Sequence, residues 1–142
     1  MSPERSLIMP RSRTRRAPVT VPDAELAVLK VLWDEEGATI RQIAARLYPG
    51  GDPSHHATVQ KLLERLQEKG CVARRRDGRA HTYTPTIARE ELIRARLQDA
   101  AEKLCEGSFT PLLTQLVDGQ RLSSEEVQAL RELVDRLDRK RG

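Results

Sequence analysis

The sequence predicts a mainly α-helical protein in which three short helices precede a two-stranded ribbon, and three further helices follow. Three observations predict this order: apolar residues recur at helical spacing, Pro and Gly breaks separate the helical stretches, and an Asp-Gly pair joins two short polar runs. The chain has 142 residues, of which 38% are hydrophobic and 32% charged. This composition is typical of a globular protein with one medium domain, or a small domain with an appendage.

The first predicted helix follows Pro22-Asp23, a helix-start signal, and ends before Gly37. Its apolar positions recur at helical spacing: Leu26, Leu29, Leu32 and Trp33. A second helix is expected to begin at Thr39, whose hydroxyl can cap the helix while Gln42 completes a capping box. Its apolar face is formed by Ile40, Ile43, Ala44 and Leu47. A short strand near Ala38 would add to the sheet formed by the ribbon.

The third predicted helix follows the break "YPGGDP" (48–53) and runs roughly from His55 to Lys69. Ser54 is expected to cap it and Gly70 to end it. The spacing i, i+3, i+4, i+7 defines one buried face: Val59, Leu62, Leu63 and Leu66. The opposite face is therefore expected to point into solvent or towards a partner.

The ribbon is predicted from "RRRDGRAHTYT" (74–84). Asp77-Gly78 tolerates positive φ at both central positions of a type I′ turn, so the strands are expected over 71–76 and 79–84. This register places His81 across from Arg74. Three helices followed by such a ribbon form a winged helix-turn-helix, which we assign to residues 21–85.

Positive charge is concentrated in two segments of the chain. Residues 1–20 and residues 55–85 each carry a net charge of +4, whereas residues 21–54 carry −3 and residues 86–142 carry −1. Residues 1–20 also contain three prolines and show no periodicity, which predicts a disordered basic arm. Localised positive charge favours a polyanionic partner such as nucleic acid, although a solvated arm and a solvated basic surface would have the same composition.

The third helix and the ribbon together predict a surface that binds double-stranded DNA. One helix fits the major groove, and the N-terminal half of that helix contacts base edges. The candidate residues on the helix are His55, His56, Ala57, Thr58, Gln60, Lys61 and Arg65. The candidate residues on the ribbon, which would contact phosphates beside the groove, are Arg74, Arg75, Arg76, Arg79 and His81.

The segment 86–142 is predicted to be a helical dimerisation domain. Its apolar positions form narrow stripes, while about fifty residues are too few to bury them comfortably in a core of their own. The stripe residues are Ile93, Leu97, Ala100, Leu104, Leu112, Leu116, Val127, Leu130, Val134 and Leu137. Ser123 and Glu126 should form a capping box for the last helix. The alternative is that these helices fold back onto the first three.

Other chemistries find little support in the sequence. His55 and His56 are adjacent and point in different directions on a helix, so neither a zinc site nor another metal site is expected. No Gly-rich phosphate loop or nucleophile motif is present, so we expect no enzyme activity and no cofactor. Cys71 and Cys105 are interpreted as packing residues rather than a disulfide framework. No apolar run is long enough to span a membrane, and we expect a cytoplasmic protein.

Three stretches resemble the BlaI/MecI/CopY family of bacterial penicillinase-type repressors: "ELAVLKVLW" (25–33), "TVQKLLERLQEKGCVARR" (58–75) and "GRAHTYTP" (78–85). The resemblance implies an N-terminal winged helix, a C-terminal dimerisation domain and a homodimer that represses genes from an inverted-repeat operator. The copper-responsive branch has a cysteine-rich tail, whereas this chain ends "DRLDRKRG", so copper sensing is not expected.

The resemblance also implies a regulatory protease or sensor as a partner. In the β-lactam-responsive branch, repression is relieved by cleavage at an Asn-Phe bond, and the equivalent position here is Gln115-Leu116. This difference argues against induction by β-lactams. It does not affect the prediction of DNA binding. A second hypothesis for the whole chain is a winged-helix module that binds an acidic protein instead of DNA.

Overall fold

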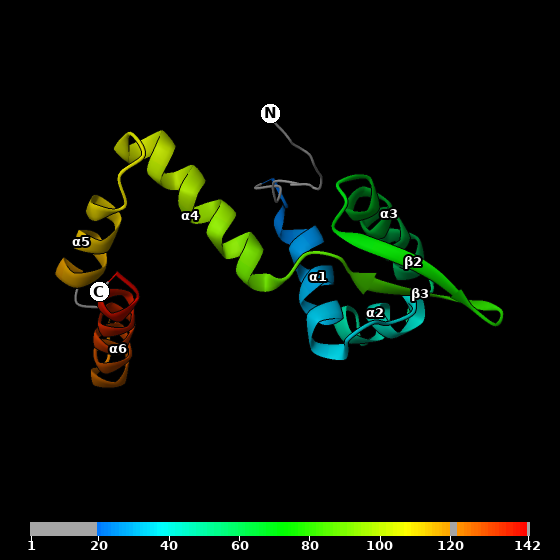
Figure 1. Ribbon diagram of the computed structural model, residues 1–142. Coiled ribbons are helices and arrows are strands. Elements are labelled where there is room, and N and C mark those ends of the chain that lie inside the picture. The colour runs from blue at the N-terminus through cyan, green and yellow to red at the C-terminus, as the bar shows by residue number, and fades with distance from the viewer. Residues whose placement is uncertain (1–19, 120–121, 142) are drawn as a thin grey trace, which may run out of the picture. The chain divides into compact units, whose positions relative to one another are not determined.

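The computed structural model describes residues 20–119 and 122–141, so the predicted basic arm lies outside the described residues except for Thr20. The elements follow the predicted order (Figure 1): α1 (Asp23–Glu35), α2 (Ile40–Leu47), α3 (Ser54–Glu68), β2 (Val72–Asp77), β3 (Ala80–Pro85), α4 (Arg89–Cys105), α5 (Thr110–Asp118) and α6 (Ser124–Arg141). The mainly α-helical winged helix-turn-helix with further C-terminal helices is confirmed. The chain forms two compact units, one ending at Leu97 and one beginning at Gln98.

The core of the first unit lies between α1, α2 and α3. Leu29, Leu32, Ile43 and Leu63 are completely buried there, as the helical spacing predicted. Val28 and Val31 of α1 are also buried, so α1 presents a wider apolar face than its leucines indicated. Two residues beyond the ribbon, Ile87 and Leu92, belong to the same core. The first unit therefore includes the start of α4.

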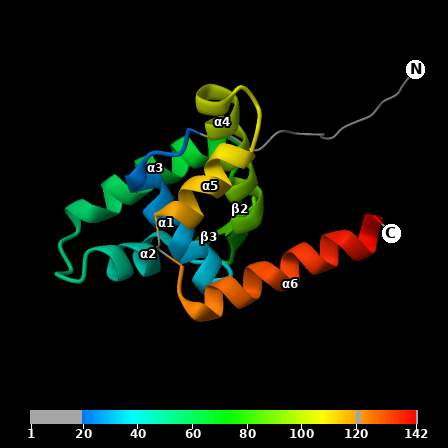
Figure 2. The same ribbon diagram turned by 90° about the vertical axis from the view of Figure 1, so that its left-hand side faces the viewer.

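The helix-turn-helix is fixed by local hydrogen bonds at the starts of α2 and α3. The predicted capping box of α2 is present: Thr39 Oγ1 accepts from the amide of Gln42 at 3.2 Å, and Gln42 Oε1 accepts from the amide of Thr39 at 2.8 Å. Figure 2 shows α2 and α3 joined by the loop of residues 48–53. The prediction that Ser54 caps α3 is wrong, because Ser54 is the first helical residue.

A neighbouring carboxylate takes the place of the predicted cap. Asp52 Oδ1 accepts from the amide of Ser54 at 3.0 Å, one of the amides that a helix start leaves without an internal partner. This hydrogen bond lowers the pKa of Asp52, because it stabilises the charged carboxylate.

The ribbon has a different register from the predicted one. The last pair before the turn is Asp77 with Ala80, so Gly78 and Arg79 are the central turn residues. Gly78 has φ +68° and Arg79 is not among the residues with positive φ. A single positive φ at a first-position glycine is the pattern of a type II′ turn rather than type I′. His81 consequently pairs with Arg76 and not with Arg74.

The ribbon is anchored to the helical core at its base. Ala38 pairs with Tyr83 in an isolated antiparallel bridge, through two hydrogen bonds of 2.8 and 3.0 Å between their main chains. This confirms the strand-like segment expected near Ala38. Tyr83 and Val72 are buried against the core, Thr82 is half-buried, and residues 73–81 are exposed. The two strands extend away from the helices towards the turn (Figure 1).

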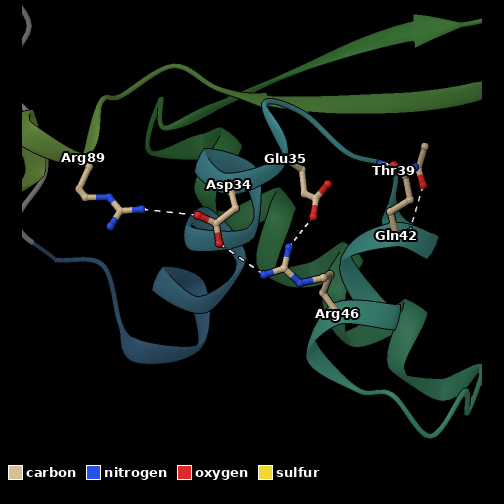
Figure 3. A network of polar contacts seen from close by, with 6 residues as sticks. All are labelled: Asp34, Glu35, Thr39, Gln42, Arg46 and Arg89. Carbon is tan, nitrogen blue, oxygen red and sulfur yellow. Dashed lines mark hydrogen bonds and ion pairs between the residues drawn. The ribbon is translucent and has the colours of Figure 1, made fainter.

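Polar contacts join α1 to α2 and to the start of α4 (Figure 3). Arg46 of α2 pairs with Glu35 at 2.5 Å and with Asp34 at 3.4 Å, and Arg89 approaches Asp34 at 3.8 Å. The hydrogen bonds that Arg46 donates to Glu35 and Asp34 raise the pKa of Arg46, because they stabilise its charged form. Trp33 adds a direct link, since its indole Nε1 donates to the carbonyl of Ile87 at 2.9 Å.

The second unit contains the end of α4 together with α5 and α6. The predicted capping box of α6 is confirmed, with Ser123 Oγ accepting from the amide of Glu126 at 3.1 Å and Glu126 Oε1 accepting from the amide of Ser123 at 3.0 Å. Neither α5 nor α6 buries a residue. Within the described ranges, no helix is both long enough and apolar enough to cross a membrane.

Candidate nucleic-acid interface

The outward face of α3 carries most of the residues predicted to read DNA. Because Val59, Leu62, Leu63 and Leu66 are buried, the remaining positions of α3 point away from the core. The predicted contact residues that are exposed on α3 are His56, Ala57, Thr58, Gln60, Lys61 and Arg65. Gln60 Nε2 lies 3.5 Å from Glu64 Oε2, at the limit of a hydrogen bond, so its amide is available for another partner.

His55 differs from the other predicted residues of α3. Its ring stacks on Tyr48, with the ring centroids 4.1 Å apart and the planes inclined by 13°. The side chain is half-buried, and Nδ1 is buried without a hydrogen-bond partner among the described residues. The contact ties the start of α3 to the end of α2, so His55 has a packing role in this structure.

The predicted arginines are distributed over both faces and the tip of the ribbon. Paired residues of an antiparallel ladder share a face, so Arg74 and Arg76 lie on the face of Tyr83 and His81. Arg75 lies on the opposite face, and Arg79 is in the turn. All four arginines and His81 are exposed. A ribbon of this kind presents positive charge in several directions. This arrangement suits a curved polyanion better than a flat one.

The cations of this surface are largely free of acidic partners. Considering only residues 20–119 and 122–141, no carboxylate forms an ion pair with Lys61, Arg65 or the four ribbon arginines. The Arg76 Nε–H donates to the main-chain carbonyl of Gly78 at 3.2 Å, which orients the side chain without neutralising it. Unpaired guanidinium groups are suited to bind phosphate oxygens.

Arg41 was missed by the sequence analysis as a residue of this surface. It lines an opening of about 430 Å³ with Thr39, Ile40, Ala80 and His81, between the start of α2 and the ribbon. Its side chain is exposed near His81, which places a further cation beside the ribbon. The available signal was its position two residues after the capping Thr39, in the helix that precedes α3.

The residues predicted for dimerisation are mostly exposed in the single chain. Ile93, Leu97 and Leu104 of α4 have exposed fractions of 50%, 49% and 78%. The other predicted residues are exposed (Leu116, Val134, Leu137) or half-buried (Ala100, Leu112, Val127, Leu130). Four large exposed apolar residues were not predicted for this role: Phe109, Leu113, Val117 and Leu133. The helical spacing that predicted the stripes would also have indicated Leu113, Val117 and Leu133.

The predicted equivalent of the family cleavage site lies inside a helix. Gln115 and Leu116 are exposed residues of α5, and the carbonyl of Gln115 accepts from the amide of Gly119 at 2.9 Å. Proteases bind extended chain, so cleavage here would require α5 to open locally.

The described part of the chain has no group of three or more His, Cys, Asp or Glu side chains placed to hold a metal ion.

Comparisons with known proteins identify the family. The family model described as penicillinase repressor matches residues 21–136. The transcriptional regulator BlaI of Mycobacterium tuberculosis is 35% identical over 122 residues, covering 84% of this chain and 86% of that protein. The penicillinase repressor of Bacillus licheniformis is 26% identical over 115 residues, covering 81% and 89%.

A further relative and a solved structure are also similar to this chain. The methicillin resistance regulatory protein MecI of Staphylococcus aureus is 23% identical over 116 residues, covering 82% of this chain and 94% of that protein. The solution structure of the DNA-binding domain of the repressor BlaI is 28% identical and covers 51% of this chain and 88% of that domain, with a TM-score of 0.43. The matched region includes the whole helix-turn-helix, the ribbon and most of the C-terminal helices, and the chain therefore belongs to the penicillinase repressor family.

Proposed function

We propose that this protein is a transcriptional repressor that binds an inverted-repeat operator in double-stranded DNA as a homodimer, in the cytoplasm. The observation that carries the proposal is the combined surface of α3 and the ribbon. There, a helix with one face buried in the core presents Lys61 and Arg65 outward, next to a ribbon that carries four exposed arginines. The family, whose members named above are repressors, supports the same function.

The two parts of the surface have different roles in this proposal. The N-terminal half of α3 enters the major groove, where Thr58, Gln60 and Lys61 contact base edges and the small Ala57 allows close approach. Arg65 and the ribbon arginines contact phosphates beside the groove, and Arg41 adds a phosphate contact from α2. Phosphate contacts supply affinity without sequence preference, whereas base contacts supply the preference.

Dimerisation is supported by the apolar stripes of α4, α5 and α6. A single chain leaves ten large hydrophobic side chains exposed among its described residues, all of them in these three helices or the segment between α4 and α5. So many large apolar side chains left exposed on a few helices indicate an interaction surface. In a two-fold dimer the same stripes of both chains would cover each other, and each chain would present one α3 to one half-site.

Selection from a random pool of duplexes tests the function. The full-length protein should retain a pseudo-palindromic sequence whose half-sites are separated by about 10 base pairs or a multiple of this length. Its affinity should fall steeply with salt, since phosphate contacts release counterions. A variant with Lys103→Ala, on an exposed residue outside both proposed surfaces, should select the same sequence. Retention without sequence preference, or none at all, would instead favour a module that binds an acidic protein.

A further inference from the structure

A pocket between α1 and the start of α4 has no part in the proposed DNA surface. Its volume is about 210 Å³, and its apolar wall is formed by Leu26, Trp33, Leu92 and Ile93. All of its lining residues belong to the first compact unit. A cavity of about 150 Å³ can hold a benzene molecule, so this pocket has room for one aromatic ring with a small substituent.

The polar part of the pocket is entirely cationic. Lys30, Arg89 and Arg96 complete the lining, and no acidic residue takes part in it. Arg89 lies over the ring of Trp33, with its guanidinium carbon 5.1 Å from the ring centroid. This stacking orients the guanidinium at the edge of the apolar wall. A pocket with one apolar wall and a few convergent charges is typical of small-molecule sites.

The three cations retain free donors. Arg96 donates to the carbonyl of Val21 at 2.7 Å through one of its two terminal nitrogens, and a guanidinium has five N–H donors. Arg89 lies 3.8 Å from Asp34, at the long limit of an ion pair, so a better-placed carboxylate can compete with Asp34. Lys30 is exposed and forms no ion pair with any residue in the described ranges.

We infer that this pocket binds a small aromatic carboxylate. The ring would pack on Trp33, Leu26 and Leu92, and the carboxylate would accept hydrogen bonds from Arg89 and Lys30 or Arg96. The inference goes beyond DNA binding, because it assigns a separate ligand site to the same chain. It does not depend on the proposed DNA surface of α3 and the ribbon.

The rival occupant is a second copy of this chain, since Ile93 belongs both to the pocket and to the proposed dimer stripe. A carboxylate is the better match for the remaining lining. An apolar helix pressed onto the pocket would remove Lys30, Arg89 and Arg96 from water without supplying an anion, which is costly. Charge complementarity therefore favours a small anion over a hydrophobic side chain.

Trp33 allows a direct test, because it is the single tryptophan of the chain. The full-length protein is titrated with three probes: benzoate, its uncharged analogue benzamide, and acetate, which lacks the ring. We expect benzoate to change the Trp33 fluorescence saturably and at lower concentration than the other two. Equal binding of benzamide would overturn the role of the cations, and equal binding of acetate would overturn the role of the apolar wall.

The binding site is then located by measuring the benzoate affinity of variants of the cationic residues. Calorimetry is used, because it does not depend on tryptophan emission. Arg89→Gln should weaken benzoate binding about tenfold, as expected for the loss of one charge-assisted hydrogen bond. Lys30→Gln should weaken it in the same direction. The matched control is Arg94→Gln, an exposed α4 residue outside the pocket, which should leave the affinity within about twofold.

Two results would contradict the inference. In the first, benzoate binds with the same affinity to the Arg89→Gln and Lys30→Gln variants as to the unmodified chain, which would place it elsewhere. In the second, benzoate binds only after Leu97→Glu has separated the chains, which would make a second copy the natural occupant. Neither result bears on duplex selection, so failure here is distinguishable from failure of the proposed function.

Discussion

Lys61 and Arg75 illustrate two kinds of contact that single residues of the proposed surface would make with DNA. Both side chains are exposed, but Lys61 is on the N-terminal half of α3 and Arg75 is on the ribbon. The Lys61→Ala change should cost about 1–3 kcal/mol on the selected operator and relax its sequence preference. The measurement is a competition assay between the operator and variants with single base-pair changes.

The comparison variant is Arg75→Ala, which removes a proposed phosphate contact. It should weaken binding to operator and unrelated duplexes alike, and reduce the salt slope by about one. The assignment of the reading face would fail if Lys61→Ala left both the affinity and the sequence preference unchanged.

Glu25 is the one buried charged residue of the described chain, with an exposed fraction of 3%. It forms an ion pair with Lys69, whose Nζ also donates to the carbonyl of Thr20 at 2.7 Å. This pair connects the start of α1 to the end of α3. Removing one member leaves the other charge partly buried without a partner, which is destabilising.

We therefore expect Glu25→Ala to lower the free energy of unfolding by about 2 kcal/mol, less than for a fully buried pair because Lys69 is partly exposed. Urea denaturation followed by circular dichroism measures this change. The control is Glu64→Ala on the exposed face of α3, which should change stability by less than about 0.5 kcal/mol. If Glu25→Ala and Glu64→Ala lowered the free energy of unfolding equally, the ion pair between Glu25 and Lys69 would contribute nothing to stability.

At the scale of elements, the ribbon depends on a close approach at Gly37. This residue has φ +118°, and a Cβ added there would lie 3.1 Å from Thr84 Cγ2 and 3.4 Å from the carbonyl oxygen of Tyr83. Only glycine adopts this conformation without strain, and it allows the chain after α1 to pair with β3 through Ala38.

Gly37→Ala should consequently lower the free energy of unfolding by about 1–3 kcal/mol, through the strained backbone and the close contacts together. Thermal or urea denaturation gives the difference. Gly50→Ala is the matched control, because a Cβ at Gly50 would meet nothing within 4 Å. If both variants had the stability of the unmodified chain, the close approach at Gly37 would not constrain the ribbon.

At the scale of the whole molecule, the central question is whether two chains associate through their apolar stripes. Leu97 of α4 is 49% exposed in the single chain, so a charge there is tolerated by the fold but costly in an apolar interface. We expect Leu97→Glu to sediment as a monomer and to bind the full operator much more weakly, because two linked half-site contacts become one.

The helical content of this variant should remain that of the unmodified chain. The neighbouring exposed residue Gln98 provides the control, since Gln98→Glu introduces the same charge on another side of α4. That variant should remain dimeric. A Leu97→Glu protein that stays dimeric, or that binds the full operator as tightly as the unmodified chain, would contradict this assembly.

Several features that depend on residues close together in the chain were determined by the sequence, although the cap of α3 and the turn type of the ribbon were not. The capping boxes of Thr39 with Gln42 and of Ser123 with Glu126 involve positions three residues apart, so helix formation alone brings them together. The buried face of α3 likewise follows from helical spacing, because a packed core selects the apolar side. These local rules were sufficient to predict the order of elements and most of the exposed residues of the surface.

The tertiary structure decided the features that depend on distant segments. The predicted and observed ribbon registers differ by two residues, a shift that keeps every side chain on its face, so the alternation of residues could not distinguish them. A long-range contact accompanies the observed register, since the bridge between Ala38 and Tyr83 ties β3 to the segment after α1. The stacking of His55 on Tyr48 and the pocket between α1 and α4 also required the folded chain, since sequence patterns specify which residues are buried but not which distant residues they meet.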